Sequence, residues 1–451
     1  MNGKPMTEGQ PWKHIIKFAF PVLIGSLLQQ LYNTVDTIIV GRYASEEALS
    51  AVGTTGTITF FFLAIAMGIS SGNGVVIAQN YGIGDEKAVR KNASAGILFL
   101  MLLGAIATVL GIVFAYPVFK YLMAVPGEIL PLTVQYFMVY SVGLLFQYGY
   151  NSLSAILRAV GDSSATLYFL LISSVANVAL DLLFVAAFKW GVIGAAVATV
   201  ISQFGALAAA FVYMRAKYPI FVFKMSEYKL DKAAIMQTVK IGFPISLQLI
   251  IVSVGLTFIQ RAVNEFGKVM TASFTVGNRI EQYINLPCNA LQTTLATFTG
   301  QNIGANRLDR VKKGAKQTVL ISLVTTIVIS TLIWVFADKI AGLFELSEAS
   351  MVYCLPHIKT VAIVNLVLSM YVPLFGVFQG TGHSGFPTIV ATSALSVRVF
   401  VTYLLRYSSF LGYQIIWWNG LFGFGMGFMV TWSFYISGKW QIKDSEVHKQ
   451  S

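Results

Sequence analysis

The chain has 451 residues, of which 56% are hydrophobic and only 11% are charged, whereas a soluble protein carries about 25% charged residues. Together with a mean hydropathy of +0.71, this composition excludes a soluble globular protein. The formal net charge is +12. In so apolar a chain, this excess indicates membrane topology and contact with anionic lipid rather than binding of nucleic acid.

Apolar stretches long enough to cross a hydrocarbon core of about 30 Å recur along the whole chain. Six spans are predicted in the first half, at Ile15–Val40, Ala51–Ala78, Ala93–Phe114, Leu132–Leu157, Ser164–Ala187 and Val192–Tyr213. Six more follow, at Ala233–Val263, Ala272–Thr297, Val319–Phe336, Val352–Phe378, Thr388–Leu405 and Leu411–Tyr435. The first run is far longer than a signal peptide, so it is expected to remain as a span. The predicted fold class is an all-α polytopic membrane protein with twelve transmembrane helices.

Basic residues are distributed unequally between the loops. With the N-terminus inside, 21 lysine and arginine residues fall on cytoplasmic segments and 7 on outer loops. Because cytoplasmic loops are enriched in basic residues, both termini are predicted to be cytoplasmic and the chain to lie in the cell membrane.

The two halves of the chain repeat each other. Phe20-Pro21 recurs as Phe243-Pro244, and a loop that begins at Gln79 recurs at Gln301. An even number of helices separates the copies, so both have the same orientation, which predicts two pseudo-symmetric six-helix bundles. The predicted division is an N-terminal lobe over residues 1–218, a cytoplasmic linker over 219–240 and a C-terminal lobe over 241–451.

Few ionisable residues lie inside the predicted spans, and each is a functional candidate because an ionised side chain at the bilayer centre costs at least about 2.5–3.5 kcal/mol. Asp36 lies on the first helix, Asn177 and Asp181 lie four residues apart on the fifth, and Thr199 lies on the sixth. Their oxygens suit a hard cation such as Na⁺, or a proton. Two nearby carboxylates in a low-dielectric site cannot both be ionised cheaply, so this set is the predicted cation-coupling site.

The alternative is that these polar groups only hydrogen-bond one helix to another. That structural role suits Asn177 and Thr199 better than it suits the two aspartates, because packing rarely needs a carboxylate at such a cost.

Further polar residues extend these helix faces. Gln29 and Asn33 precede Asp36 by seven and three residues and therefore share its face of the first helix. On the fourth helix, Asn151 and Ser154 either line the same cavity or serve helix packing.

Each half also carries a proline inside its first helix, Pro21 and Pro244. A proline removes a helix hydrogen bond and permits bending, so both are candidate hinges. Static kinks are the alternative.

The second half lacks the acid pair. In the repeat, Asp36 corresponds to Ile259, Asp181 to Thr402 and Asn177 to Arg398. Coupling to a cation is therefore predicted in the first lobe alone. Arg279 and Glu281, with Arg398, form a possible polar site of the second lobe, and a neutralising pair of Arg279 and Glu281 is favoured over a second ion site.

Enzymatic chemistry is not indicated. The chain has no G-x-x-x-x-G-K-[ST] phosphate loop, its four histidines are scattered, and its two cysteines have no metal-ligand or disulfide spacing. We expect neither an enzyme nor a bound cofactor.

Taken in order, several segments resemble the multidrug and toxic compound extrusion (MATE) transporters, in particular their DinF-like branch. The segments are the run from Pro21 to Asp36, the loops at Gln79 and Gln301, and the stretches Leu157–Asp162 and Gln379–Gly382. The resemblance covers nearly the whole chain and implies a V-shaped pair of six-helix bundles that exports organic cations in exchange for Na⁺ or H⁺.

The resemblance also assigns roles to residues. It implies that Asp36, Asn177, Asp181 and Thr199 form the cation site of the amino-terminal lobe. It places Gln29 and Asn151 in the substrate cavity, which we expect to include Tyr32, Asn33 and Ser154 as well. Another branch of the family uses acids on the seventh and tenth helices, and here those helices have no interior carboxylate.

The predicted function is a cation-coupled multidrug efflux antiporter that works by alternating access. Its expected partners are small organic, cationic drugs or dyes and membrane lipid, its expected state is a monomer, and its expected phenotype is antibiotic resistance. One alternative is a flippase for lipid or lipid-linked oligosaccharide, which Arg398 favours. Another is a passive channel or a membrane receptor without ion coupling.

Overall fold

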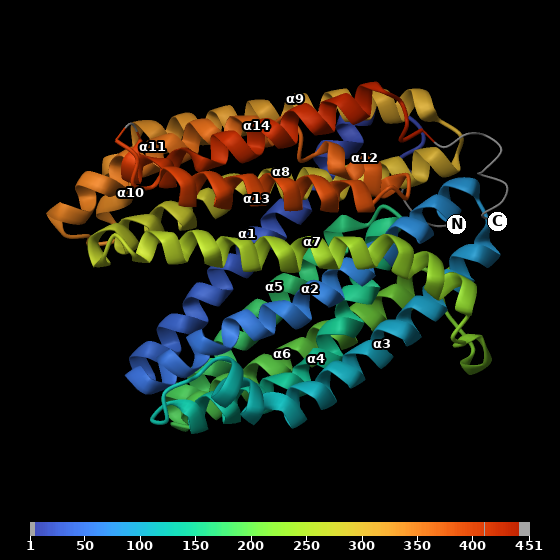
Figure 1. The fold of residues 1–451 in the computed structure, drawn as a ribbon. Helices are drawn as coiled ribbons and strands as arrows, with labels where there is room; N and C mark the ends of the chain where they lie inside the picture. The colour runs from blue at the N-terminus through green and yellow to red at the C-terminus, as the bar shows by residue number, and fades with distance from the viewer. Residues whose placement is uncertain (1–4, 410, 442–451) are drawn as a thin grey trace. The chain divides into compact units, whose positions relative to one another are not determined.

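Helices make up all the regular structure of residues 5–409 and 411–441, which are the residues that the computed structural model describes (Figure 1). Ten helical segments in this part of the chain are long and apolar enough to cross a membrane. With α8 (Lys268–Gly304) and α14 (Ile415–Ile436), the two other long helices, they account for the twelve predicted spans. The all-α fold class is confirmed. The chain ends lie outside the described residues, and their cytoplasmic placement stays a prediction.

Contacts divide the chain into two units. The first unit contains Phe20–Ser246, and the second contains Met6–Ala19 and the chain from Leu247 onward. Two helices, α1 (Pro11–Tyr43) and α7 (Lys232–Asn264), therefore contribute to both units. The predicted lobe boundaries at residues 218 and 241 stay a prediction.

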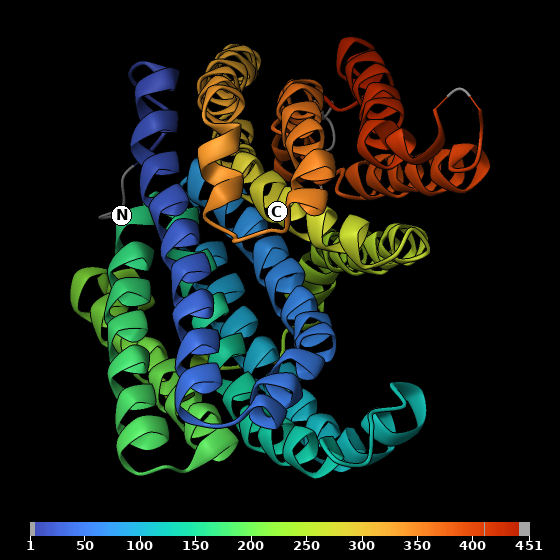
Figure 2. The same ribbon diagram turned by 90° about the vertical axis from the view of Figure 1, so that its left-hand side faces the viewer.

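The first unit is built from the later part of α1, the early part of α7 and the helices between them. Figure 2 shows α1 and α2 joined by a short turn. The elements between α1 and α7 are α2 (Glu46–Ile83), α3 (Glu86–Pro117), the π-helix η1 (Val118–Leu122), α4 (Leu130–Ala159), α5 (Ser163–Asp181), the π-helix η2 (Leu182–Ala187), α6 (Gly191–Lys217), η3 (Pro219–Phe221) and η4 (Met225–Glu227).

The second unit contains the remaining helices. They are the late part of α7, α8, α9 (Leu308–Val335), α10 (Ala337–Gly342), α11 (Glu348–Ser369), α12 (Leu374–Gly380), α13 (Gly385–Leu405), η5 (Gly412–Gln414) and α14.

Several helices begin earlier than the apolar pattern predicts. α2 starts at Glu46, where the Ser45 hydroxyl accepts a hydrogen bond from the Ala48 N–H at 3.1 Å. α3 starts at Glu86, and Asp85 caps it through the Ala88 N–H at 2.9 Å. Hydropathy marks only the apolar part of a helix, whereas the caps determine where the helix starts.

The predicted span Val352–Phe378 lies within the membrane-length segment Glu348–Gly380, but a turn interrupts its helix. α11 ends at Ser369, a turn follows, and α12 begins at Leu374 directly after Pro373. Proline cannot donate the helix hydrogen bond at its own position, so the chain leaves α-helical geometry there.

The N-terminal stretch belongs to the second unit because Arg310 on α9 holds its main chain. The Arg310 guanidinium donates to the carbonyl oxygens of Met6, Glu8 and Gly9 at 3.0, 2.9 and 2.7 Å. The Gln301 side chain accepts from the Met6 N–H at 2.8 Å. These contacts hold the start of the chain against the second unit.

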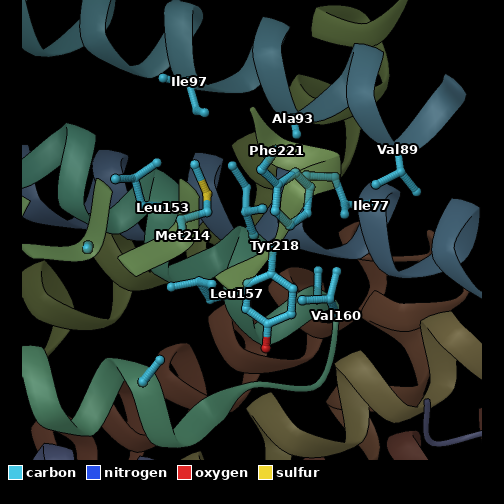
Figure 3. Close-up of a cluster of buried hydrophobic side chains, with 14 of the residues drawn as sticks. Ile77, Val89, Ala93, Ile97, Leu153, Leu157, Val160, Met214, Tyr218 and Phe221 are labelled. Atoms are coloured by element: carbon cyan, nitrogen blue, oxygen red, sulfur yellow. The ribbon is translucent and has the colours of Figure 1, made fainter. Parts of the chain in front are cut away.

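One end of the first unit has an apolar core around Tyr218, which packs among Leu157 and Val160 (Figure 3). The Tyr218 hydroxyl donates to Asp162 Oδ2 at 2.7 Å. Tyr213 and Lys217 donate to the same oxygen at 2.8 and 3.0 Å. Asp162 itself is only 1% exposed, so three donors converge on one buried carboxylate.

Glycines allow α2 and α7 to cross closely inside the first unit. A Cβ atom added at Gly72 would lie 2.5 Å from both the Gly242 nitrogen and the Thr238 oxygen, and one added at Gly68 would lie 2.3 Å from the Ser246 nitrogen. The glycines are four residues apart, the spacing that lets two membrane helices touch along their backbones.

Gly72→Ala should lower the thermal stability of the purified protein in detergent. The new methyl group meets backbone atoms that cannot move aside, a kind of overpacking that costs about 1–3 kcal/mol. The matched control is Gly53→Ala on the same helix, where a Cβ meets nothing within 4 Å. Equal melting temperatures for the two variants would contradict the close crossing.

Asp162→Asn should destabilise the first unit at neutral pH by about 1–3 kcal/mol, because an amide nitrogen in place of Oδ2 would face three donors. Burial alone would raise the pKa of Asp162, but hydrogen bonds from Tyr218, Lys217 and Tyr213 hold that pKa below its ordinary value of 3.8. The stabilisation is therefore complete at neutral pH and is lost as the pH falls through the lowered pKa.

Thermal melts of wild type and Asp162→Asn across a pH series check this prediction. The difference between them should be constant near neutral pH and should shrink only in acid, below about pH 4. A difference that disappears between pH 8 and pH 6 would contradict it.

Candidate functional site

The structure brings the two predicted acids together inside the first unit. The carboxyl groups of Asp36 on α1 and Asp181 on α5 lie within hydrogen-bonding reach of each other. Asp181 is fully buried and Asp36 is half-buried. The Oδ1 atoms of both residues are buried and have no hydrogen-bond donor. Two ionised carboxylates repel each other, so this contact requires a proton or a cation between them.

Asn177 and Thr199 complete the set. Asn177 lies one turn before Asp181 on α5 and is 1% exposed, and Thr199 on α6 is 5% exposed. With the Asn177 nitrogen facing the acid, it donates to Asp181 Oδ2 at 2.8 Å, and its oxygen accepts from the Thr199 N–H at 3.3 Å. The Thr199 hydroxyl donates to the Ala195 carbonyl at 3.0 Å. All four predicted coupling residues are thus neighbours.

The helix carrying Asp181 changes geometry at this residue. α5 ends at Asp181, and the π-helix η2 continues from Leu182. Short π-helical segments interrupt the regular hydrogen-bond ladder and are frequent at functional sites. The sequence pattern predicted a regular helix here, because Leu182–Ala187 is apolar throughout and gives no local sign of the change.

Tyrosines surround the acids, and most of them were missed by the sequence analysis. Tyr32 lies within hydrogen-bonding reach of Thr199. Tyr136 and Tyr140 on α4 stack at 6.0 Å between ring centroids, and both lie within electrostatic range of Asp36. Their spacing of four residues on a helix that also carries Gln147 was the signal that could have revealed them.

Two glutamines extend the polar set from α4 to α6. The Gln203 amide and the Tyr140 hydroxyl each donate to Gln147 Oε1 at 3.4 Å. Gly143 makes room for this pair, because a Cβ there would lie 2.2 Å from the Gln203 oxygen.

The predicted cavity residues differ in how far they are exposed. Gln29 and Asn33 on α1 are exposed. Asn151 on α4 is half-buried and donates to the Gln147 carbonyl of its own helix at 2.8 Å. Ser154 is 2% exposed. Of the five predicted residues, Tyr32 lies within hydrogen-bonding reach of the coupling residue Thr199.

The corresponding region of the second unit has no acid pair. Ile259 is fully buried in an apolar cluster with Leu395 and Trp417. Thr402 is also fully buried, and its hydroxyl donates to the carbonyl of Arg398 at 2.7 Å. Arg398 is half-buried, and its Nε donates to Asn419 Oδ1 at 2.8 Å.

The other predicted polar residues of the second unit do not join Arg398. Arg279 on α8 is exposed, and Glu281 is half-buried. Neither forms an ion pair with a described residue, so the expected neutralising pair is absent from the described structure. Within the described chain, no group of three or more histidine, cysteine, aspartate or glutamate side chains could hold a metal ion.

Comparison with known proteins gives the family. The MatE family model matches residues 21–183 and 244–404, one match in each half of the chain. The chain is 27% identical over 433 residues to "Probable multidrug resistance protein YoeA" of Bacillus subtilis (strain 168), covering 94% of this chain and 93% of that protein.

Two solved structures show the same fold. An outward-facing MATE family multidrug resistance transporter of the MOP superfamily matches with a TM-score of 0.90 at 22% identity, over 99% of this chain and 98% of that one. A MOP superfamily transporter from Pyrococcus furiosus Vc1 (DSM3638), described as having a binding pocket of reverse polarity, matches with a TM-score of 0.90 at 23% identity, over 97% and 98%. The predicted pair of six-helix bundles is confirmed. The chain therefore belongs to the MatE family and is a multi-pass membrane transporter, not an enzyme.

Proposed function

We propose that this transporter is an antiporter that couples the inward movement of a cation to the export of organic cations. The observation that carries the proposal is the contact between Asp36 and Asp181 in the first unit, with one buried oxygen of each free of donors. Asn177 and Thr199 hold Asp181 in place. When the proton or cation leaves, the two carboxylates repel each other. This repulsion favours a different conformation of the unit.

The exchange follows from differential affinity. A ligand shifts a conformational equilibrium only if it binds one conformation better than the other. In our proposal the occupied acid pair favours one conformation, and the bound drug favours the other. One positive charge that moves inward across 100 mV releases about 2.3 kcal/mol, equivalent to about fiftyfold in concentration. A single coupled ion is therefore sufficient for modest drug accumulation ratios.

The coupling ion in this proposal is a proton or Na⁺. A proton needs only the two carboxyl groups, whereas Na⁺ would take oxygens of Asp36, Asp181, Asn177 and Thr199 as ligands.

Asp36→Asn and Asp181→Asn should each reduce gradient-driven dye transport in proteoliposomes to the level of empty vesicles, with folding retained. The amide keeps the shape of the side chain but cannot bind and release a proton. The measurement imposes a pH gradient and a Na⁺ gradient separately, and a proton-coupled carrier should respond to the pH gradient alone.

The matched control is Asp338→Asn, which removes an exposed acid of the second unit. It should transport like wild type. Full gradient-driven transport by Asp36→Asn would overturn the proposal, and flux that ignores both gradients would identify a passive channel.

We further propose that Pro21 and Pro244 are the hinges of this exchange. The chain passes from one unit to the other between Ala19 and Phe20 in α1, and between Ser246 and Leu247 in α7. Each proline lies within a few residues of such a point. Because a proline removes a helix hydrogen bond, bending there costs less than elsewhere in the helix.

Pro21→Ala should slow transport severalfold, because restoring the missing hydrogen bond favours a straight α1 by up to about 3 kcal/mol. Initial rates of dye transport in proteoliposomes measure the effect. Pro356→Ala is the control, since that proline lies inside α11, which remains within one unit. Equal slowing by both substitutions would rule out a special role for Pro21.

The remaining parts of the proposal concern the environment of the transporter. We propose that the substrates are small organic cations, which contact the exposed Gln29 and Asn33 and also Tyr32. We further propose that the transporter is a monomer of the DinF-like branch, that it needs no cofactor and that it lies in the cell membrane. The excess of basic residues on one set of loops supports cytoplasmic placement of both termini.

A flippase for lipid or lipid-linked oligosaccharide is the second candidate function. Arg398, a cation inside a membrane helix, is the observation that favours it. A similar fold in Pyrococcus furiosus has a binding pocket described as having reverse polarity. Movement of a labelled anionic lipid between leaflets without dye transport would support the flippase.

A further inference from the structure

Arg398 is a half-buried cation that has no counterion among the described residues. It lies in α13, a membrane-length helix, and is half-buried. The ion pairs of the described residues do not include it, and the positions that would correspond to the two acids hold Ile259 and Thr402. An arginine inside a membrane is costly and therefore normally faces a partner or a water-filled space. No protein carboxylate among the described residues fills that role.

The side chain is nevertheless held in a defined position. Its Nε donates to Asn419 Oδ1 at 2.8 Å, and the Asn419 nitrogen is itself fixed by the Ile416 carbonyl at 2.6 Å. The guanidinium carbon lies 4.9 Å from the centre of the Phe424 ring. A Cβ at Gly423 would lie 2.5 Å from Arg398 Cγ, so the glycine makes room for the aliphatic stem.

These contacts engage only one of the three guanidinium nitrogens. Among the described residues, none accepts a hydrogen bond from the two terminal nitrogens of Arg398, and neither of these atoms is sealed from the surface. Titratable side chains within electrostatic range of Arg398 include His357 and Tyr371, and neither is a carboxylate. The two terminal nitrogens are thus a pre-positioned fork, which matches the geometry of an oxyanion such as a carboxylate or a phosphate.

We propose that Arg398 is the residue that binds the carboxylate of those exported compounds that carry one. The inference rests on the proposed efflux function and names the side chain of the second unit that recognises this part of a substrate. The first unit supplies the acids that a coupling cation needs, and the second supplies the positive charge that a carboxylate needs. Phe424 is buried, and its ring lies against the guanidinium, so it helps to fix the position of the charge.

The test compares a rhodamine ethyl ester, which is a cation, with its parent rhodamine acid, which is a zwitterion. Both dyes are measured for binding to the purified protein by fluorescence polarisation and for gradient-driven transport in proteoliposomes. Arg398→Gln should weaken binding of the acid by roughly ten- to a hundredfold, the range for hydrogen bonds to a charged group. It should leave binding and transport of the ester unchanged.

Two further variants identify the cause. Arg398→Lys should recover part of the affinity for the acid, because it keeps the charge but loses the planar fork. Arg261→Gln removes an exposed arginine of the same unit and should change neither dye. If Arg398→Gln weakens both dyes equally, or neither, the inference is wrong and Arg398 is structural.

The experiment distinguishes failure of the carboxylate site from failure of the proposed efflux function. If the wild type transports the ester but binds no acid, the carboxylate site fails while the efflux function stands. If neither dye is transported, the efflux function fails, and the binding measurement still decides the site. If Arg398→Gln alters only the response to an anionic phospholipid added to the vesicles, the oxyanion is a lipid phosphate and the inference is overturned.

Discussion

In the first unit, carboxyl groups from two different helices meet where little water can reach them. Asp181 is fully buried, and one oxygen each of Asp36 and Asp181 has no donor. In bulk water such a pair would simply ionise and separate, but the surrounding helices and tyrosines prevent separation. The pair therefore changes its energy greatly with the presence or absence of one positive charge. Asn177, Thr199 and the π-helix after Asp181 are best understood as the structure that holds this contact in place.

The two repeats have diverged in charge at equivalent positions. The first carries aspartates, whereas the second carries an isoleucine in an apolar cluster, a threonine that bonds its own helix, and an arginine held by Asn419. Two acid pairs would double the cost of burying charge in a transporter with no bound ion. In our proposal the acid pair of one repeat couples to the ion, and the base of the other repeat binds the substrate. The two repeats thus share the arrangement of their helices but not their charged side chains.

Backbone features govern how the helices approach and bend. Gly68 and Gly72 bring the backbones of α2 and α7 into contact, which is the means of close association where hydrophobic burial gives no advantage between helices. Pro21 and Pro244 weaken α1 and α7 near the points at which these helices pass from one unit to the other. Close crossings resist deformation, and prolines permit it. On α7 the two features occur together, because Pro244 lies between Gly242 and Ser246, where α2 crosses.

The sequence by itself determined the membrane class, the twelve spans and the internal repeat, because hydropathy and helical periodicity are local properties of the chain. It also predicted that Asn177 and Asp181 share a face, since residues four apart always do. Only the tertiary structure decided that Asp36 meets Asp181, that Tyr136 and Tyr140 lie beside them, and that Arg279 and Glu281 do not pair. It also decided where α5 turns into a π-helix and where Pro373 interrupts a long apolar span. These features depend on the rotation and crossing of helices far apart in sequence, which no local pattern records.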